Sequence, residues 1–364
     1  MQEKRNVNIE LIRIVAMLAV IIHHYFRHGG GTVWPEFGTV KYTVFWAADA
    51  FAFVCVNLFV LISGYCLAQT KFKISRLIRL WVETETYSII CVVVCKILGA
   101  DISSIQVIKA LMPFTTESYW FVTAYALLLC FAPFLNIAIN NMNQKQHRLL
   151  IALVVIVFSI MPTFFVWERD LITTGMDYEW FVALYIIASY IRKYGLKCNV
   201  RSALVGYVIF SFVTGLARIP LGVVSYRIVG NYVLSGLFFR YNSITVLVAA
   251  VFLFWALLNT DIKNKMIQKA ISYFAPLTFA VYLIHDNEFV RNILWSTLPM
   301  RKLYESGVVA YSLGLIIFVP LIYFACCAIE IIRVYIMRKL NYKNVLEKSD
   351  EIYDKVLAKK TWNV

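Results

Sequence analysis

The sequence predicts an all-α fold: a polytopic membrane helical bundle of about ten transmembrane helices, with both termini in the cytoplasm. Hydrophobic residue types make up 61% of the 364 residues and charged types 15%, whereas a soluble domain is roughly half apolar and about a quarter charged. The apolar residues are gathered in long blocks. The block at 308–329 carries no charge and covers the roughly 20 residues that a helix needs to cross the hydrocarbon layer.

The apolar blocks predict the individual spans. The first block follows Lys4 and Arg5, but no small-residue cleavage site comes after it, so we interpret it as a retained span and not as a signal peptide. The third is interrupted by Glu83, Glu85 and Lys96, and the seventh is short. In chain order, the predicted spans are 9–26, 45–68, 82–98, 118–140, 149–167, 178–195, 202–220, 242–259, 272–288 and 307–332.

The distribution of Lys and Arg predicts the orientation. With these spans, the two ends and the even-numbered loops carry roughly twice as many Lys and Arg residues as the odd-numbered loops. The richer side is expected to be cytoplasmic. The net charge of +14 is therefore interpreted as a topological signal and not as a nucleic-acid surface. The eight cysteines show neither metal-ligand spacing nor a disulfide framework, so no metal is expected.

The first span carries two ionisable residues on one helical face. Arg13 and His24 are eleven residues apart, which is about 20° past three full turns and about 16 Å along the helix axis. Ionisable residues inside a span face the bundle or a water-filled cavity and are functional candidates. The alternatives are an arginine that reaches the headgroups, a histidine at the outer interface, or His23 as the functional imidazole.

The second span ends in Ser63-Gly64, a pair that permits close helix contact. The segment 71–81 that follows it mixes cations with apolar residues and is typical of an interfacial amphipathic helix. Arg76 and Arg79 lie three residues apart on one face, and paired arginines bind phosphate groups well. Lipid headgroup binding is the alternative interpretation.

Four further residues are predicted near the outer ends of spans. Tyr119 and Trp120 open the fourth span, Glu179 lies at the start of the sixth, and His285 ends the ninth. The two aromatic residues are typical of a membrane-interface belt and would equally form a stacking platform for a sugar. His285 stands at the membrane level of His24, where it would join the same cavity or remain a surface histidine beside Asp286.

In this order, the motifs resemble the integral-membrane acyltransferase 3 family, which O-acylates bacterial surface carbohydrates. That family carries a basic residue, ten residues and then a histidine in its first span, as Arg13 and His24 do. It also has a Phe-x-x-Ser-Gly-like span end followed by an Arg-x-x-Arg pair. The similar segments here are 59–65, 76–79, Tyr119-Trp120-Phe121 leading to 132–136, and Tyr282-Leu283-Ile284-His285.

The resemblance implies that 1–340 form an integral-membrane acyltransferase domain and 341–364 a cytoplasmic basic C-terminal tail. It implies acetyl-coenzyme A as acyl donor, a glycan or glycolipid acceptor, and a bacterial plasma membrane as the location. The expected donor site is Arg13, Arg76 and Arg79, and the expected acceptor site is Tyr119, Trp120, Glu179 and His285. His24 is expected to act as general base or as acyl-carrying nucleophile.

Two other classes of function share features of this sequence. A transporter or flippase for a lipid-linked sugar would have a similar number of spans and ionisable residues facing a cavity, but such proteins often contain internal repeats, and the sequence shows none. A membrane synthase or polymerase of surface polysaccharide would need no coenzyme A and would usually have large outer loops.

Overall fold

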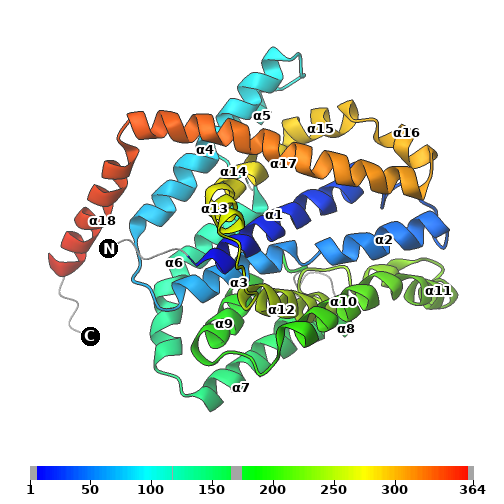
Figure 1. The fold of residues 1–364 in the computed structure, drawn as a ribbon, viewed down its shortest axis with the longest axis horizontal. Helices are drawn as coiled ribbons and strands as arrows, with labels where there is room; N and C mark the ends of the chain where they lie inside the picture. Colours follow the sequence, from blue (N-terminus) through cyan, green and yellow to red (C-terminus); the bar gives the residue numbers. More distant parts are fainter. Residues whose placement is uncertain (1–5, 117, 165–173, 360–364) are drawn as a thin grey trace.

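The computed structural model describes residues 6–116, 118–164 and 174–359, and the regular structure of this part of the chain is entirely helical. The long helices lie beside one another along the horizontal axis of Figure 1, and both ends of the chain lie at the left of that view. This arrangement confirms the predicted all-α bundle.

The helices of the first half are α1 (Val7–His28), α2 (Val40–Ala52), α3 (Cys55–Leu67), α4 (Ile74–Ile97), α5 (Ser104–Ala110), α6 (Trp120–Asn140), α7 (Gln144–Val155), the π-helix η1 (Ile156–Ile160) and α8 (Met161–Phe164). Those of the second half are α9 (Tyr178–Tyr194), α10 (Val200–Leu216), α11 (Arg218–Val229), η2 (Val233–Gly236), α12 (Ile244–Leu258), α13 (Lys265–Phe274), η3 (Ala275–Leu277), α14 (Thr278–His285), α15 (Glu288–Thr297), α16 (Met300–Glu305), α17 (Val308–Lys339) and α18 (Tyr342–Lys359).

Each predicted span overlaps helical structure, although the expected end of the fifth at 167 lies outside the described residues. Among the described residues, seven segments are long and apolar enough to cross a membrane: Val7–His28, Val40–Leu67, Trp120–Asn140, Gln144–Phe164, Val200–Val229, Lys265–His285 and Val308–Lys339. The helices α4, α9 and α12 fall short of this by charge or length. The count of ten and the side of each terminus stay predictions.

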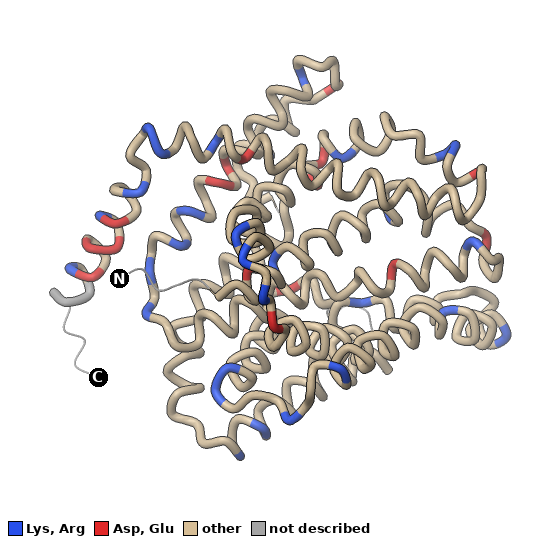
Figure 2. Tube along the Cα trace, in the orientation of Figure 1, with Lys and Arg blue, Asp and Glu red and all other residues tan. Residues whose placement is uncertain are grey.

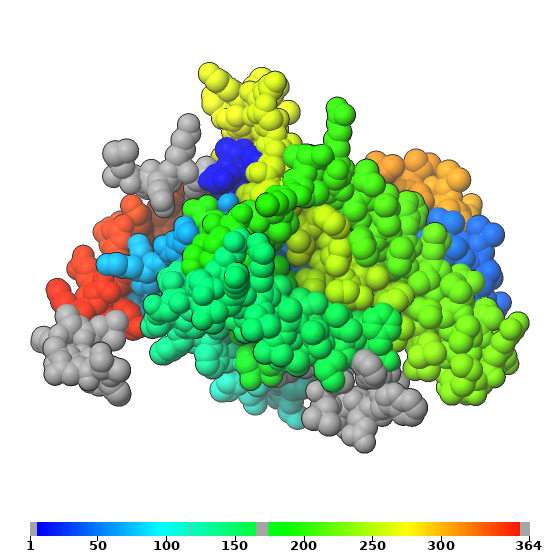
Figure 3. Space-filling model, turned by 90° about the horizontal axis from the view of Figure 1, so that it is seen from below, coloured from blue at the N-terminus to red at the C-terminus, as the bar shows by residue number. Residues whose placement is uncertain are grey.

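The surface of the bundle is apolar where lipid would cover it. Along α10, the side chains of Val205, Ile209 and Phe212 are exposed. Figure 3 shows the face to which residues of about 120–230 contribute most. In Figure 2, Lys, Arg, Asp and Glu lie mostly near helix ends, and the middles of the long helices are mainly free of them. Apolar exposed surfaces, with charged residues near the helix ends, are expected of helices that cross a bilayer.

Helix α1 lies in the centre of the bundle and contacts α2, α3, α12, α13, α14 and α17. Ile12, Ala16 and Ile21 are fully buried along it. The side chain of Asn6 caps the first turn by accepting a hydrogen bond from the backbone of Asn8, as helix N-termini require.

Hydrogen bonds hold α1 at both ends. At its start, the Asn8 amide donates to the carbonyl oxygens of Leu258 and Thr260, 2.8 Å away in each case, at the end of α12. At its far end, the Tyr25 hydroxyl donates to the Tyr311 carbonyl (2.7 Å), and the Tyr311 hydroxyl donates back to the Tyr25 carbonyl (3.0 Å). The axial position of every α1 side chain is thereby set relative to α12 and α17.

The helix that carries Arg76 and Arg79 differs from the sequence interpretation. We expected 71–81 to be a separate interfacial amphipathic helix, but α4 begins at Ile74 and runs without a break to Ile97. The two arginines therefore belong to the first turns of the same helix that forms the predicted third span. Leu80, Glu83 and Thr84 on this helix are buried, so the helix packs into the bundle from Leu80 onward.

The C-terminal segment forms the helix α18, which packs on α4. The carboxylate of Asp350 accepts hydrogen bonds from the backbone N–H and the hydroxyl of Ser75, at 2.9 and 2.8 Å. Ser75 lies in the first turn of α4, where backbone N–H groups have no partner within the helix. The predicted tail 341–364 is thus attached to the bundle over its described part.

Gly64 allows the close helix contact that Ser63-Gly64 predicted. A Cβ atom at this position would lie 2.8 Å from both the Cβ of Ala188 and the Cα of Tyr185 on α9. Gly64→Val is expected to push α3 and α9 apart and to lower the free energy of unfolding by about 1–3 kcal/mol. Thermal unfolding in detergent, followed by tryptophan fluorescence, measures this as a lower midpoint temperature.

Ala138→Val on α6 is the matched control, because Ala138 is exposed on the surface of the bundle and the added methyl groups meet no packed neighbour. Equal midpoint temperatures for both variants and the wild type would contradict the assignment of Gly64 to a tight helix contact.

Candidate active site

The arginines predicted for donor binding line one cavity. Arg13 comes from the second turn of α1, and Arg76 and Arg79 come from the start of α4, near the end of the bundle that carries the termini. The cavity has a volume of about 340 Å³. The hydroxyls of Ser63 and Tyr125, 3.1 Å apart, also line it. We call it the basic cavity.

The charges of the basic cavity are only partly balanced. Arg13 lies 3.3 Å from Glu10 one turn earlier, and Arg79 lies 3.7 Å from Glu83. Arg76 forms no ion pair with a described carboxylate and donates only to a backbone carbonyl and a threonine hydroxyl. A guanidinium in this state can still bind an anionic oxygen with two parallel N–H groups.

A second, narrower cavity continues from the basic cavity toward the middle of the bundle. Phe59, Phe121 and Phe279 line both cavities, and we call these three residues the phenylalanine collar. The second cavity, the central cavity, has a volume of about 60 Å³. His23 and His24 lie in its wall beyond the collar.

A third cavity opens beyond the central one, on the side away from the termini. This distal cavity has a volume of about 550 Å³. The central and distal cavities share the lining residues His23, His24, Trp120, Tyr241, Tyr282 and Asp286. The three cavities therefore form a series along α1, with Arg13 near one end of the helix and His24 near the other. The shared helical face of these two residues predicted this arrangement.

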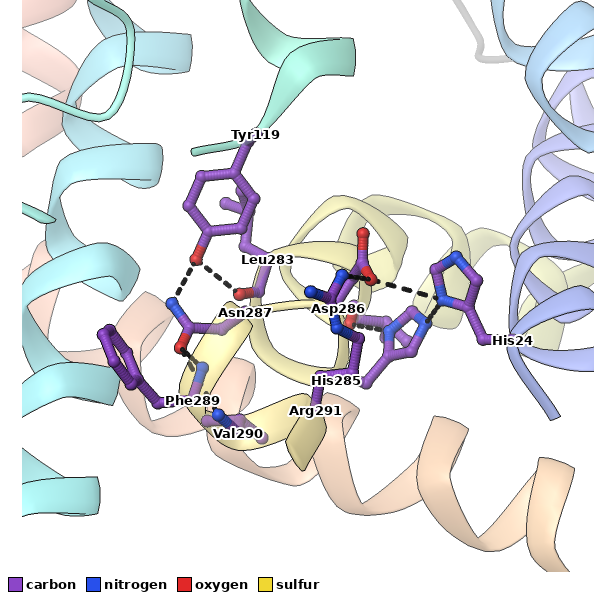
Figure 4. A network of polar contacts seen from close by, with 10 residues as sticks. His24, Tyr119, Leu283, His285, Asp286, Asn287, Phe289, Val290 and Arg291 are labelled. Atoms are coloured by element: carbon purple, nitrogen blue, oxygen red, sulfur yellow. Dashed lines mark hydrogen bonds and ion pairs between the residues drawn. The ribbon is translucent and has the colours of Figure 1, made fainter. Parts of the chain in front are cut away.

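His24 makes its closest polar contact with a residue 261 positions later. Its Nδ1 lies 3.0 Å from the Nε2 of His285 at the end of α14, and 3.6 Å from the Oδ1 of Asp286. Figure 4 shows these side chains pointing toward one another from α1 and from the end of α14. His285 is 1% exposed, so it lies behind His24, away from the cavity.

The hydrogen bonds determine which nitrogen of His24 is available. The Nδ1 of His285 contacts the backbone carbonyl of Val281 at 2.5 Å, and a carbonyl only accepts hydrogen bonds, so this nitrogen carries the proton. The Nε2 of neutral His285 is then an acceptor, and the Nδ1 of His24 donates to it. The Nε2 of His24 keeps its lone pair and is free for a ligand.

Two further residues surround this histidine pair. Asp286 lies 3.3 Å from the Nη1 of Arg291 on α15, so its carboxylate is held between Arg291 and His24 (Figure 4). A positive charge that develops on His24 would be stabilised by this carboxylate at short range. Asp286 and Arg291 both line the distal cavity.

The alternative imidazole, His23, has its own carboxylate partner. Its Nδ1 lies 2.9 Å from the Oδ1 of Asp49 on α2, and Asp49 is fully buried. Asp49 Oδ2 has no hydrogen-bond partner among the described residues. Because His23 and His24 both line the central and distal cavities, the structure keeps both as candidates for proton transfer.

Of the residues predicted for the acceptor site, only Trp120 lines the cavities described above. Trp120 lines the central and distal cavities and is stacked on Tyr241, with ring centroids 5.9 Å apart. Tyr241 in turn stacks on Phe53 at 4.7 Å. These rings form an aromatic wall in the distal cavity, in keeping with the stacking platform expected at this position.

Tyr119, His285 and Glu179 do not line any of the three cavities. The Tyr119 hydroxyl donates to the Leu283 carbonyl at 2.9 Å and accepts from the Asn287 amide at 2.8 Å, so it supports the chain turn that holds His285 (Figure 4). The orientation of Tyr119, His285 and Glu179, which the sequence did not determine, directs their side chains away from the space where an acceptor would lie.

The sequence interpretation overlooked two buried charges. Asp49 lies inside the apolar helix α2, and Arg218 is the first residue of α11; both line the distal cavity. Ionisable residues inside membrane segments are functional candidates by default, and this signal was available at both positions.

Three side chains at the site could hold a metal ion. Ligand atoms of His24, His28 and Asp286 all lie within 4.8 Å of one another, and histidine nitrogens with a carboxylate oxygen suit zinc. The sequence analysis expected no metal, and the acyl-transfer chemistry considered below requires none.

Comparison with known proteins identifies the family. A family model of the acyltransferase domain matches residues 6–331, which cover all three cavities and nearly the whole chain. The comparisons with curated proteins and with solved structures give no match. The match includes Arg13, His24, the arginine pair on α4 and His285 in one domain. The chain is a multi-pass membrane protein that belongs to the acyltransferase 3 family.

Proposed function

We propose that this protein is a membrane O-acyltransferase that transfers an acetyl or other short acyl group from acyl-coenzyme A to a hydroxyl of a cell-surface glycan or its lipid-linked precursor. The series of three cavities supports this most strongly, because it joins three arginines at one end to a histidine with a free nitrogen and an aromatic wall beyond it. No observation favours the transporter alternative.

The donor would enter from the cytoplasm through the basic cavity. Coenzyme A carries several phosphates on its nucleotide and an uncharged pantetheine arm. The phosphates would bind Arg76 and Arg79, with Arg13 nearby, through paired charge-assisted hydrogen bonds. The arm would pass the phenylalanine collar and bring the thioester to His24, which lies about 16 Å along α1 from Arg13.

The chemistry requires one proton acceptor. As general base, His24 Nε2 takes the proton of the acceptor hydroxyl while the oxygen attacks the thioester carbonyl carbon. The carbon–sulfur bond then breaks, and the imidazolium returns the proton to the departing coenzyme A sulfur. As nucleophile, His24 would itself receive the acyl group and pass it to the hydroxyl. In both cases the products are an ester and the free thiol.

The distal cavity fits a polyhydroxylated acceptor. Its aromatic wall offers ring faces to a sugar, and polar atoms in its lining lack partners. Trp46 Nε1, Asp49 Oδ2 and Tyr282 Oη are buried and have no hydrogen-bond partner among the described residues. Buried polar groups normally have hydrogen-bond partners, and a ligand with hydroxyl groups would provide partners for these three atoms.

His24→Ala is expected to abolish transfer, since it removes the proton acceptor and with it a rate factor of roughly 10²–10⁴. Purified wild type and variant in nanodiscs receive radiolabelled acetyl-coenzyme A and a crude glycolipid extract, and label in the glycolipid is counted. His23→Ala serves as the matched comparison on the same helix and is expected to retain more activity.

Retention of full activity by well-folded His24→Ala would remove His24 from the mechanism, and a loss confined to His23→Ala would assign the base to the pair of His23 and Asp49. If the wild type neither binds coenzyme A nor transfers or hydrolyses the acetyl group, the enzyme proposal itself fails in favour of transport.

Arg76→Gln and Arg79→Gln are expected to raise the KM for acetyl-coenzyme A about tenfold or more while changing kcat little, because their contacts to phosphates are made equally in the ground and transition states. Arg201→Gln is the control, since Arg201 is an exposed arginine of α10 that lines none of the three cavities. An unchanged KM in both α4 variants would show that these arginines act only as topological charges.

His285 is expected to act as a positioning residue. His285→Ala removes the acceptor of the His24 Nδ1–H bond and should lower kcat, by less than His24→Ala does, without changing either KM. In His285→Gln, the amide oxygen can accept the same hydrogen bond, so part of the lost turnover should return. Equal loss in both variants, or a raised KM, would contradict this role.

A further inference from the structure

Arg218 occupies an unusual position in the distal cavity. It is the first residue of α11 and is 8% exposed. Its guanidinium lies over the ring of Trp46, 3.5 Å from the ring centroid. Its Nε donates to the Tyr42 hydroxyl at 3.1 Å and its Nη2 to the Ser235 hydroxyl at 3.5 Å. No carboxylate in the described part of the chain forms an ion pair with it.

Among the described residues Arg218 has no carboxylate in direct contact, and Asp49 interacts with its charge only at longer range. A guanidinium stays protonated in proteins, and a buried charge is normally paired. The two hydroxyls accept from two of its five N–H groups, and the aromatic face of Trp46 attracts the cation without neutralising it. The remaining donors belong to a side chain that lines the cavity.

The other charged groups that the structure describes in the distal cavity form no direct ion pair with Arg218. Asp49 accepts from His23 at 2.9 Å, and Asp286 is held by Arg291 at 3.3 Å. Arg27 also lines the cavity and is exposed. When the histidines are neutral, three arginines face two carboxylates, so the cavity still carries one more positive than negative charge. Asp49, whose Oδ2 has no hydrogen-bond partner among the described residues, offsets part of the Arg218 charge from beyond contact distance.

We propose that the acceptor of this enzyme carries an anionic group, a carboxylate or a phosphate on the glycan, which Arg218 binds. The sugar beside this group would stack on the wall formed by Trp120, Tyr241 and Phe53 and present its hydroxyl to His24. This inference rests on the proposed function and adds the chemical class of the acceptor. A buried guanidinium at a fixed position would also select which hydroxyl of the sugar reaches His24.

Matched acceptor probes test this in phosphatidylcholine nanodiscs, whose lipid carries no net charge. The first probe is a trisaccharide with one hexuronic acid, and the second is its carboxyl-reduced form, which differs only in the charge. A third probe carries a glycerol phosphate on the neutral trisaccharide. Binding is measured by calorimetry and acetyl transfer separately, so that a failure of transfer does not hide the binding result.

The variants are Arg218→Gln, Arg218→Lys and the control Arg301→Gln. Arg301 lies at the same end of the bundle, packs over the ring of Trp34 with its guanidinium 5.2 Å from the centroid, and lines none of the three cavities. The wild type should bind one of the charged probes at least tenfold more tightly than the neutral one. Arg218→Gln should lose that preference, Arg218→Lys should retain part of it, and Arg301→Gln should behave as wild type.

Equal binding of charged and neutral probes by the wild type would overturn the proposal, as would an equal change for all probes in Arg218→Gln, which would show a structural role for Arg218. Loss of preference for the charged probe when phosphatidylglycerol is added would assign the anion to a lipid headgroup and would also overturn it. Preference for a charged probe without any acetyl transfer would keep this inference and reject the proposed function.

Discussion

The polar side chains of α1 impose the main constraint on this structure. A single central helix carries Arg13, His23 and His24 through an apolar bundle, where every polar group requires a partner or a cavity. The hydrogen bonds of Asn8 and Tyr25 fix its axial position. The surrounding helices leave a cavity beside Arg13, toward the termini. Helices α2 and α14 supply the hydrogen-bond partners of the two histidines.

A second group of buried charges keeps α4 in place. Glu83 on α4 lies 3.2 Å from Arg333 on α17, and Arg333 lies 2.6 Å from Glu330. The Tyr87 hydroxyl donates to Glu330. Breaking such a buried network is costly, because it leaves an uncompensated charge. Since Glu83 also approaches Arg79, the network that joins α4 to α17 also orients an arginine of the basic cavity.

The sequence predicted the parts of this site that depend on local periodicity. The eleven-residue spacing of Arg13 and His24 fixes their common face within one helix, and the three-residue spacing of the α4 arginines fixes theirs. The membrane level of His285 placed it near His24, but the sequence did not determine that His285 contacts His24 from behind instead of lining the cavity, because this depends on how α14 is rotated against α1. The orientation of Glu179 likewise depends on how α9 is rotated against its neighbours, which tertiary packing determines.

The phenylalanine collar has a consequence for the membrane as a whole. Cavities that enter a bundle from both ends would let ions leak across the membrane if a continuous column of water joined them. Among the described residues, Phe59, Phe121 and Phe279 are the ones that line both the basic and the central cavity, and apolar constrictions exclude water and protons. We infer that a closed collar would separate the water at the two ends of the bundle, so that any donor arm passing it would have to be slender and uncharged.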